Sequence, residues 1–145
     1  MAYSYHTTLD RAGLALGAGG LLSGIVALGL VLAGGERAPV ALLAAWLVGS
    51  LVAIFAIAAL GGPCWLALHL AGYRCAWHAA LLGALLAMIV FVAGQTYGFG
   101  LFDAPVSDGG TLMFRWLSAV ATSVLIALVA AGIAVAMWRI AYRPA

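Results

Sequence analysis

Residues 116–138 read WLSAVATSVLIALVAAGIAVAMW, a run of 23 residues without Asp, Glu, Lys or Arg. At about 1.5 Å of rise per residue, a helix of this length extends for roughly 35 Å, which exceeds the ~30 Å hydrocarbon core of a bilayer. The run shows no alternation of apolar and polar residues and is too long for an ordinary strand. We therefore predict a transmembrane helix here and not a buried strand.

Three other stretches share this character, since each has 21 or 22 residues and no charged side chain. They cover about residues 12–33, 40–60 and 76–97. Four crossings of a bilayer leave too few residues for a soluble domain. The sequence predicts that residues 1–145 form a single transmembrane domain, an all-α membrane protein with four transmembrane helices in an up-down bundle with short loops.

The composition supports this assignment. The chain is 67% hydrophobic, 7% charged and has a mean hydropathy of +1.20, whereas soluble domains are roughly 45 to 50% apolar and about 25% charged. These values exclude soluble and disordered chains, and a net charge of +2 is too small for a nucleic-acid-binding surface. The lipid bilayer is the expected environment. All six basic residues are Arg, with no Lys or Asn, a bias that fits a GC-rich bacterial genome and hence a bacterial inner membrane.

Turn residues define the connections between the spans. The segment Gly34-Gly35-Glu36-Arg37-Ala38-Pro39 predicts a tight hairpin between the first two helices. Gly61-Gly62-Pro63 predicts the end of the second helix, followed by a short interfacial helix, with a kinked extension of the second helix as the alternative. Residues 98–115 predict the longest loop, with a solvated turn at Asp108-Gly109-Gly110.

The arginines predict the orientation. With both termini in the cytoplasm, four arginines lie on that side and two lie on the far side, accompanied by acids. The cytoplasmic set is Arg11, Arg74, Arg139 and Arg143, and the far set is Arg37 and Arg115. Trp65, Tyr73, Trp77, Trp138 and Tyr142 fall near the cytoplasmic ends of the spans, as expected for an interfacial aromatic belt.

Small residues at helical spacing are the candidate interface residues. They are Gly13, Gly17, Gly20 and Gly24 in the first span and Ala45, Gly49 and Ala53 in the second. Such stripes let two backbones approach closely, which favours helix association in lipid. Two interpretations stay open: the stripes pack the first two helices together within one chain, or they face an oligomer or another protein.

Polar residues within the spans are sparse. They are Ser23, Ser50, Gln95, Thr96, Ser118, Thr122 and Ser123. Ser and Thr are expected to bond the carbonyl four residues earlier, and Gln95 is expected to be satisfied by water near a helix end. No predicted span contains a charge that would support proton-coupled transport.

Four weak metal candidates, Cys64, His69, Cys75 and His78, lie within fifteen residues. The two Cys are 11 apart and the two His 9 apart, whereas structural zinc sites typically space Cys pairs by about two to four and His pairs by about three to five. We therefore expect no metal site and no cofactor. The sequence also offers no nucleophile, base and acid on one side of the membrane, which argues against an enzyme.

Three functions remain. The leading hypothesis is a non-catalytic multi-pass membrane protein, an accessory or assembly subunit that docks on other membrane proteins or on itself. The alternative is a small homo-oligomeric transporter or channel for neutral solutes. The third is a metal or redox protein that uses the Cys64–His78 loop.

Overall fold

The computed structural model of the chain describes residues 5–95 and 109–144. In these residues, four helical runs are long and apolar enough to cross a membrane. The predicted all-α fold with four transmembrane helices is thus confirmed. The elements in chain order are β1 (Tyr5–His6), α1 (Leu9–Ala33), α2 (Pro39–Ala56), the π-helical turn η1 (Ile57–Gly61), α3 (Gly62–Leu70), α4 (Ala76–Ala93), α5 (Gly109–Ala141) and β2 (Arg143–Pro144).

The hairpin between α1 and α2 forms at the predicted residues. Gly35 has a φ of 93°, a left-handed conformation that glycine adopts without a Cβ penalty. Oε1 of Glu36 accepts hydrogen bonds from the backbone N–H of Ala38 at 2.8 Å and of Arg37 at 2.9 Å. These two bonds stabilise the carboxylate and lower the pKa of Glu36. They also place a negative charge at the N-terminus of α2, where Pro39 begins the helix.

The helix that contains the second predicted span, 40–60, does not end near residue 60. Helical structure continues from Pro39 to Leu70, a run of 32 residues that extends for about 48 Å. Pro63 lacks an N–H, and in a regular helix its ring would clash with the carbonyl four residues earlier. The wider turn of η1 precedes Pro63, and the Gly62 N–H bonds the Ile57 carbonyl across it. The break expected at Gly61-Gly62-Pro63 is therefore wrong, and the alternative of an extended second helix describes the structure.

The helix that contains the fourth predicted span, 116–138, is also longer than that stretch. Helix α5 covers 33 residues from Gly109 to Ala141, so residues 109–115, which were expected in a loop, form its first turns. The third span ends as helix α4 at Ala93, with Gly94 and Gln95 in a further π-type turn. The rest of the expected loop, including Asp103 and Asp108, lies outside the described residues.

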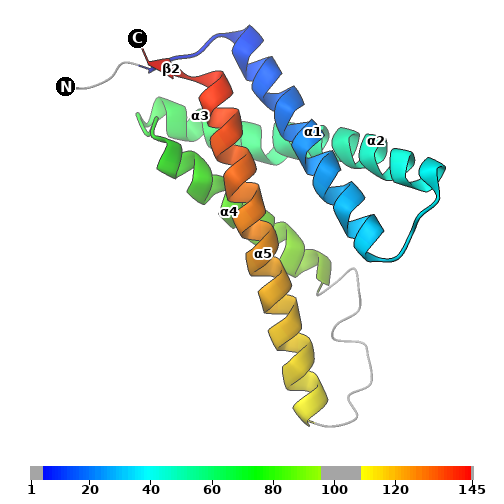
Figure 1. Cartoon of the computed structure of the whole chain (residues 1–145). Helices are drawn as coiled ribbons and strands as arrows, with labels where there is room; N and C mark the ends of the chain where they lie inside the picture. The colour runs from blue at the N-terminus through cyan, green and yellow to red at the C-terminus, as the bar shows by residue number, and fades with distance from the viewer. Residues whose placement is uncertain (1–4, 96–108, 145) are drawn as a thin grey trace.

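The helices form two hairpins joined through α1 and α5. The most extensive contacts are between α4 and α5 and between α1 and α2, followed by those between α1 and α5 (Figure 1). The start of α1 and the end of α5 lie at one end of the molecule, where β1 pairs antiparallel with β2. We call this the terminal end.

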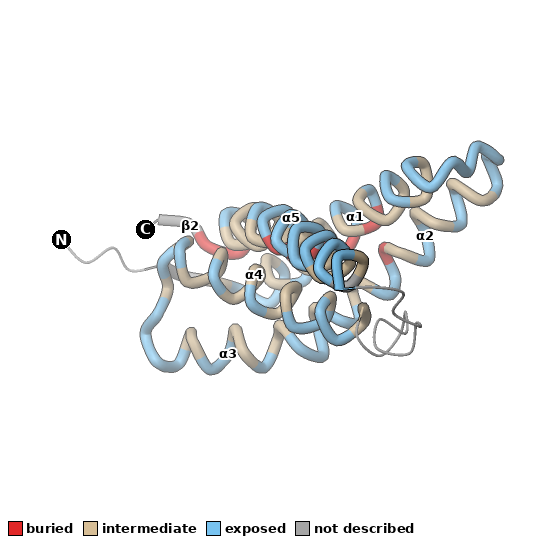
Figure 2. The backbone as a smooth tube through the Cα atoms, turned by 90° about the horizontal axis from the view of Figure 1, so that it is seen from below, coloured by how far each residue is buried: buried red, intermediate tan, exposed pale blue. Residues whose placement is uncertain are grey.

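Buried residues are few and mostly small. Figure 2 shows buried backbone at a few points along α1, α2 and α5 and exposed or intermediate residues elsewhere. Large apolar side chains such as Phe55, Leu85 and Leu128 are exposed. Because lipid tails are as apolar as these side chains, such a surface suits a bilayer, and close packing of small residues holds the helices together.

Candidate docking surface

The glycines of α1 fall into two groups with different surroundings. Gly20 and Gly24 face α2. A Cβ added at Gly24 would meet the Ser50 hydroxyl and lie 2.7 Å from the Trp46 carbonyl oxygen, and one at Gly20 would meet the Ile54 side chain. These two glycines therefore allow α1 and α2 to pack closely within the chain.

Helix α2 contributes Gly49 to the same contact. A Cβ on Gly49 would lie 2.7 Å from the Cβ of Ala27 and 3.6 Å from the Cα of Gly24. Ala45 and Ala53, one turn before and after Gly49, are half-buried. The small residues of α2 thus lie along the side of the helix that meets α1.

Two further close contacts involve glycines that the stripe pattern missed. A Cβ on Gly19 would meet the Met137 side chain of α5. A Cβ on Gly83 of α4 would lie 2.7 Å from the Cβ of Ala134 and 2.9 Å from the carbonyl oxygen of Ala130. The signal for Gly83 is present in the sequence, since Ala130 and Ala134 stand one helical turn apart and form a small-residue stripe on α5.

Gly13 and Gly17 form the second group, and they face open space. A Cβ added at either position would meet no atom within 4 Å beyond its own turn of helix. They line a shallow groove of about 720 Å³. The groove, which we call the α1 groove, is lined by Asp10, Gly13, Leu14, Gly17, Ala18 and Leu21. In the part of the chain that the structure describes, no other helix fills it.

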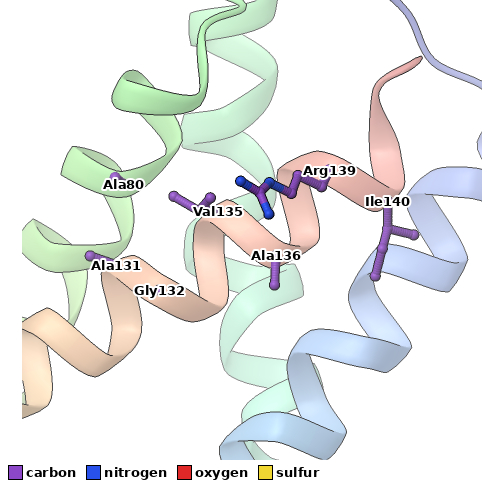
Figure 3. A pocket seen from close by; sticks show the side chains of 7 residues that line it. All are labelled: Ala80, Ala131, Gly132, Val135, Ala136, Arg139 and Ile140. Atoms are coloured by element: carbon purple, nitrogen blue, oxygen red, sulfur yellow. The ribbon is translucent and has the colours of Figure 1, made fainter. Parts of the chain in front are cut away.

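A second groove lies on α5 beside α4, and we call it the α5 groove. It has a volume of about 550 Å³. Its lining residues are Ala80, Ala131, Gly132, Val135, Ala136, Arg139 and Ile140 (Figure 3). Gly132 is exposed, and a Cβ there would meet no atom within 4 Å. The lining is small and apolar except for the Arg139 side chain, which extends alongside Val135 in Figure 3.

Aromatic residues gather at the terminal end. Nδ1 of His69 lies 2.7 Å from the Tyr142 hydroxyl oxygen, and the Trp65 ring lies 5.3 Å from the His69 ring. Nε1 of Trp138 donates a hydrogen bond to the Arg74 carbonyl at 3.0 Å. These contacts join α3 and the turn after it to the end of α5.

Burial controls the ionisation of Tyr142, whose side chain is 4% exposed. Removal from water disfavours the phenolate and raises the pKa of Tyr142 above its ordinary value of 10.0, while a hydrogen bond from Trp65 and the charge of Arg74 act in the opposite direction. Tyr142 therefore packs as a neutral phenol and links two helices.

The weak metal candidates have other surroundings. His69 bonds Tyr142, and the His78 ring lies 4.9 Å from the Tyr73 ring. Cys64 is half-buried, Cys75 is exposed, and both are free thiols. Among residues 5–95 and 109–144, no three His, Cys, Asp or Glu side chains lie close enough together to hold a metal ion.

The polar residues of the spans bond within the fold. Ser23, Thr122 and Ser123 each donate to the carbonyl four residues earlier at 2.8 Å, as expected. Gln95 differs from the expectation that water satisfies it, because its Nε2 donates to the Ser123 hydroxyl at 3.3 Å and to the Ala119 carbonyl at 3.5 Å. Gln95 thus links α4 to α5.

The chain matches no known family, no curated protein and no solved structure. Its own surfaces are the basis for a functional proposal. Both grooves are shallow and apolar along most of their length, which suits contact with a helix or with lipid better than binding of a polar substrate.

Proposed function

We propose that the chain is a non-catalytic multi-pass membrane protein that acts by lateral docking, as an accessory or assembly subunit, and that the α1 groove is its docking surface. The observation that carries the proposal is the contrast within α1. Gly20 and Gly24 are used by α2, whereas Gly13 and Gly17 have the same residue type and open surroundings. A glycine in a helix interior costs about 0.5 to 1 kcal/mol relative to alanine, and close approach of another helix compensates for that cost.

The physical basis is that burying apolar side chains contributes little to helix association in lipid, because the lipid tails are equally apolar. Helices associate there through close van der Waals contact, which small residues permit. The α1 groove has small residues in its centre and Leu14 and Leu21 beside them. This shape accommodates the ridge of a second transmembrane helix.

We further propose that the chain resides in a bacterial inner membrane with both termini in the cytoplasm. The support is the arginine distribution. Arg11, Arg74 and Arg139 belong to the terminal end, whereas Arg37 belongs to the hairpin at the other end of α1. Basic residues concentrate on the cytoplasmic side of inner-membrane proteins.

The test compares three leucine substitutions on α1 in the full chain, extracted in mild detergent. We expect Gly17→Leu to shift the protein from a larger assembly to the size of one chain, with unchanged abundance and helicity, because the added side chain has room in the monomer and blocks only the groove. Gly29→Leu is the matched control, since a Cβ at Gly29, as at Gly17, would meet no atom within 4 Å, and it should leave the assembly intact.

Gly24→Leu is the control for folding. Its side chain collides with Ser50 and Trp46, so it should lower abundance and thermal stability instead of only altering assembly. If Gly17→Leu forms the same assembly as the parent, the α1 groove is not a docking surface and the proposal is wrong.

A further inference from the structure

We infer that the helix received by the α1 groove is α5 of a second copy of this chain, which docks through its α5 groove. The inference rests on the proposed function and names the partner of the same surface. It is based on the residue types, the spacing and the charges of the two grooves.

The two grooves have the same order of residues when they are read from the terminal end. On α1 that order is a charge at position 10 followed by small or apolar residues at 13, 17 and 21. On α5 it is a charge at 139 followed by Ala136 and Gly132 in the groove, and then by Leu128, one turn beyond the lining residues. Both series have intervals of three, four and four residues. If the two charged residues lie at the same depth in the membrane, each later pair of positions therefore lies at the same depth too, because both helices rise equally per residue.

The small residues of the two series coincide. Gly13 falls opposite Ala136, and Gly17 falls opposite Gly132. Gly132 and Gly17 both lack an atom within 4 Å of an added Cβ. Two helices with small residues at these two matching depths can approach closely there.

The charges are complementary. Asp10 lines the α1 groove and Arg139 lines the α5 groove, and both are exposed. Within the described residues, neither side chain has a hydrogen bond or an ion pair. Each charge also interacts favourably with the dipole of its own helix, because Asp10 lies in the first turn of α1 and Arg139 in the last turn of α5. That effect accounts for the sign of each charge but not for its position in a groove.

The orientation of the two copies follows from the fold. The start of α1 and the end of α5 lie at the same end of the molecule, so copies inserted in the same direction present Asp10 and Arg139 at one depth and run α1 antiparallel to the neighbouring α5. The contact joins two different surfaces. Such a heterologous interface leads to a closed ring or an open row, not to a two-fold dimer.

Disulfide trapping in membranes tests the inference. A disulfide requires a Cα–Cα distance of about 4.4 to 6.8 Å, which only close helix packing provides. In a Cys64→Ser, Cys75→Ser background, membranes that contain a Gly17→Cys copy and a differently tagged Gly132→Cys copy should form a mixed dimer on oxidation. Gly17→Cys alone and Gly132→Cys alone should not, because the contact is heterologous. Gly29→Cys with Gly132→Cys is the matched control and should not cross-link.

Charge exchange provides a second readout without cysteines. Asp10→Arg or Arg139→Asp alone should weaken self-association about fivefold, measured by energy transfer between labelled copies in lipid vesicles. The double variant D10R/R139D should restore it, a recovery that a loss of helix-dipole stabilisation would not produce.

The outcomes separate this inference from the proposed function. If Gly17→Cys cross-links to itself, or if no mixed dimer forms while Gly17→Leu still releases the chain from a larger assembly, the second-copy inference is wrong and docking through the α1 groove stands. If Gly17→Leu changes neither self-association nor any larger assembly, both are wrong. Purified protein that stays a single chain in lipid vesicles also overturns the inference.

Discussion

The Nδ1 atom of His69 and the hydroxyl oxygen of Tyr142 lie 2.7 Å apart although the two residues are 73 positions apart in the sequence. The contact fastens the end of α5 to α3, and Trp65 and Trp138 pack their rings beside Tyr142. It therefore joins the last turn of α3 to the residue that follows α5 at the terminal end.

We predict that Tyr142→Phe destabilises the protein by about 0.5 to 1.5 kcal/mol, the net value of a typical hydrogen bond, because the ring stays and only the hydroxyl is lost. Unfolding in detergent, followed by circular dichroism, measures the change. Tyr73→Phe is the control, because Tyr73 is exposed and its substitution should have little effect. Equal stabilities of the two variants would contradict the importance of the hydroxyl.

The raised pKa of Tyr142 predicts a loss of stability in alkali. The folded protein holds the phenol proton more tightly than the unfolded chain, whose Tyr142 ionises near 10.0. This contribution is fully present below pH 10.0 and is lost as the pH rises from there through the higher folded-state pKa. Comparing the parent with Tyr142→Phe across about pH 9 to 11 isolates it from the other tyrosines. A parent that loses no more stability than the variant would refute the prediction.

The sequence predicted the number of spans and the first hairpin because both depend on local properties. Charge-free runs have a minimum length for crossing lipid, and Gly34 to Pro39 contains the turn chemistry that a hairpin needs. The helix that contains the second predicted span continues past residue 60 for a reason that is not local. Pro63 normally ends a helix, yet the π turn before it accommodates the ring, and no residue pattern announces that turn.

The partner of Gln95 could not be predicted from the sequence either. Gln95 lies near a helix end and was expected to bond water, but its partner Ser123 belongs to another helix. We predict that Gln95→Ala costs about 0.6 kcal/mol of stability, with an upper range near 1.7 kcal/mol, as measured for interhelical hydrogen bonds in membranes. Thr122→Ala is the matched control, because the Thr122 hydroxyl donates to the Ser118 carbonyl of its own helix. A larger loss for Thr122→Ala would argue against the link between α4 and α5.

Orientation is testable with a native thiol. Cys75 is exposed next to Arg74, and Ala38 is exposed in the hairpin at the opposite end of the spans. We predict that a membrane-impermeant thiol reagent labels Cys75 of the Cys64→Ser variant in inside-out vesicles, because basic loops stay in the cytoplasm.

The complementary probe is Ala38→Cys in the Cys64→Ser, Cys75→Ser background, which should react in right-side-out vesicles. This pair keeps all six arginines and therefore leaves the signal for insertion unchanged. The reverse labelling pattern, or labelling of both probes from both sides, would overturn the proposed topology.

The candidate docking residues were partly visible in the sequence. Spacing identified Gly13, Gly17, Gly20 and Gly24 as one set but not their different surroundings. That difference arises because α2 meets α1 at Gly20, where Ile54 fills the space, and at Gly24, where Ser50 and Trp46 fill it. No atoms of α2 reach Gly13 or Gly17. Which glycine faces which neighbour is a property of helix placement, and the sequence of one helix does not contain it.

This difference leads to a final prediction about Gly24 and Gly29, two glycines of the same helix. Gly24→Ala places a Cβ against the Ser50 hydroxyl and 2.7 Å from the Trp46 carbonyl oxygen, and forced overpacking of this kind costs about 1 to 3 kcal/mol. Gly29→Ala meets open space, so it should be neutral or stabilise by up to about 1 kcal/mol through the higher helix propensity of alanine. Ser50→Gly added to Gly24→Ala should recover part of the loss, because the hydroxyl is removed and the carbonyl remains. A double-mutant cycle on the free energy of unfolding measures that recovery. If Gly24→Ala is as stable as Gly29→Ala, α1 and α2 do not pack through Gly24, and the division of the α1 glycines into an internal group and a free group fails with it.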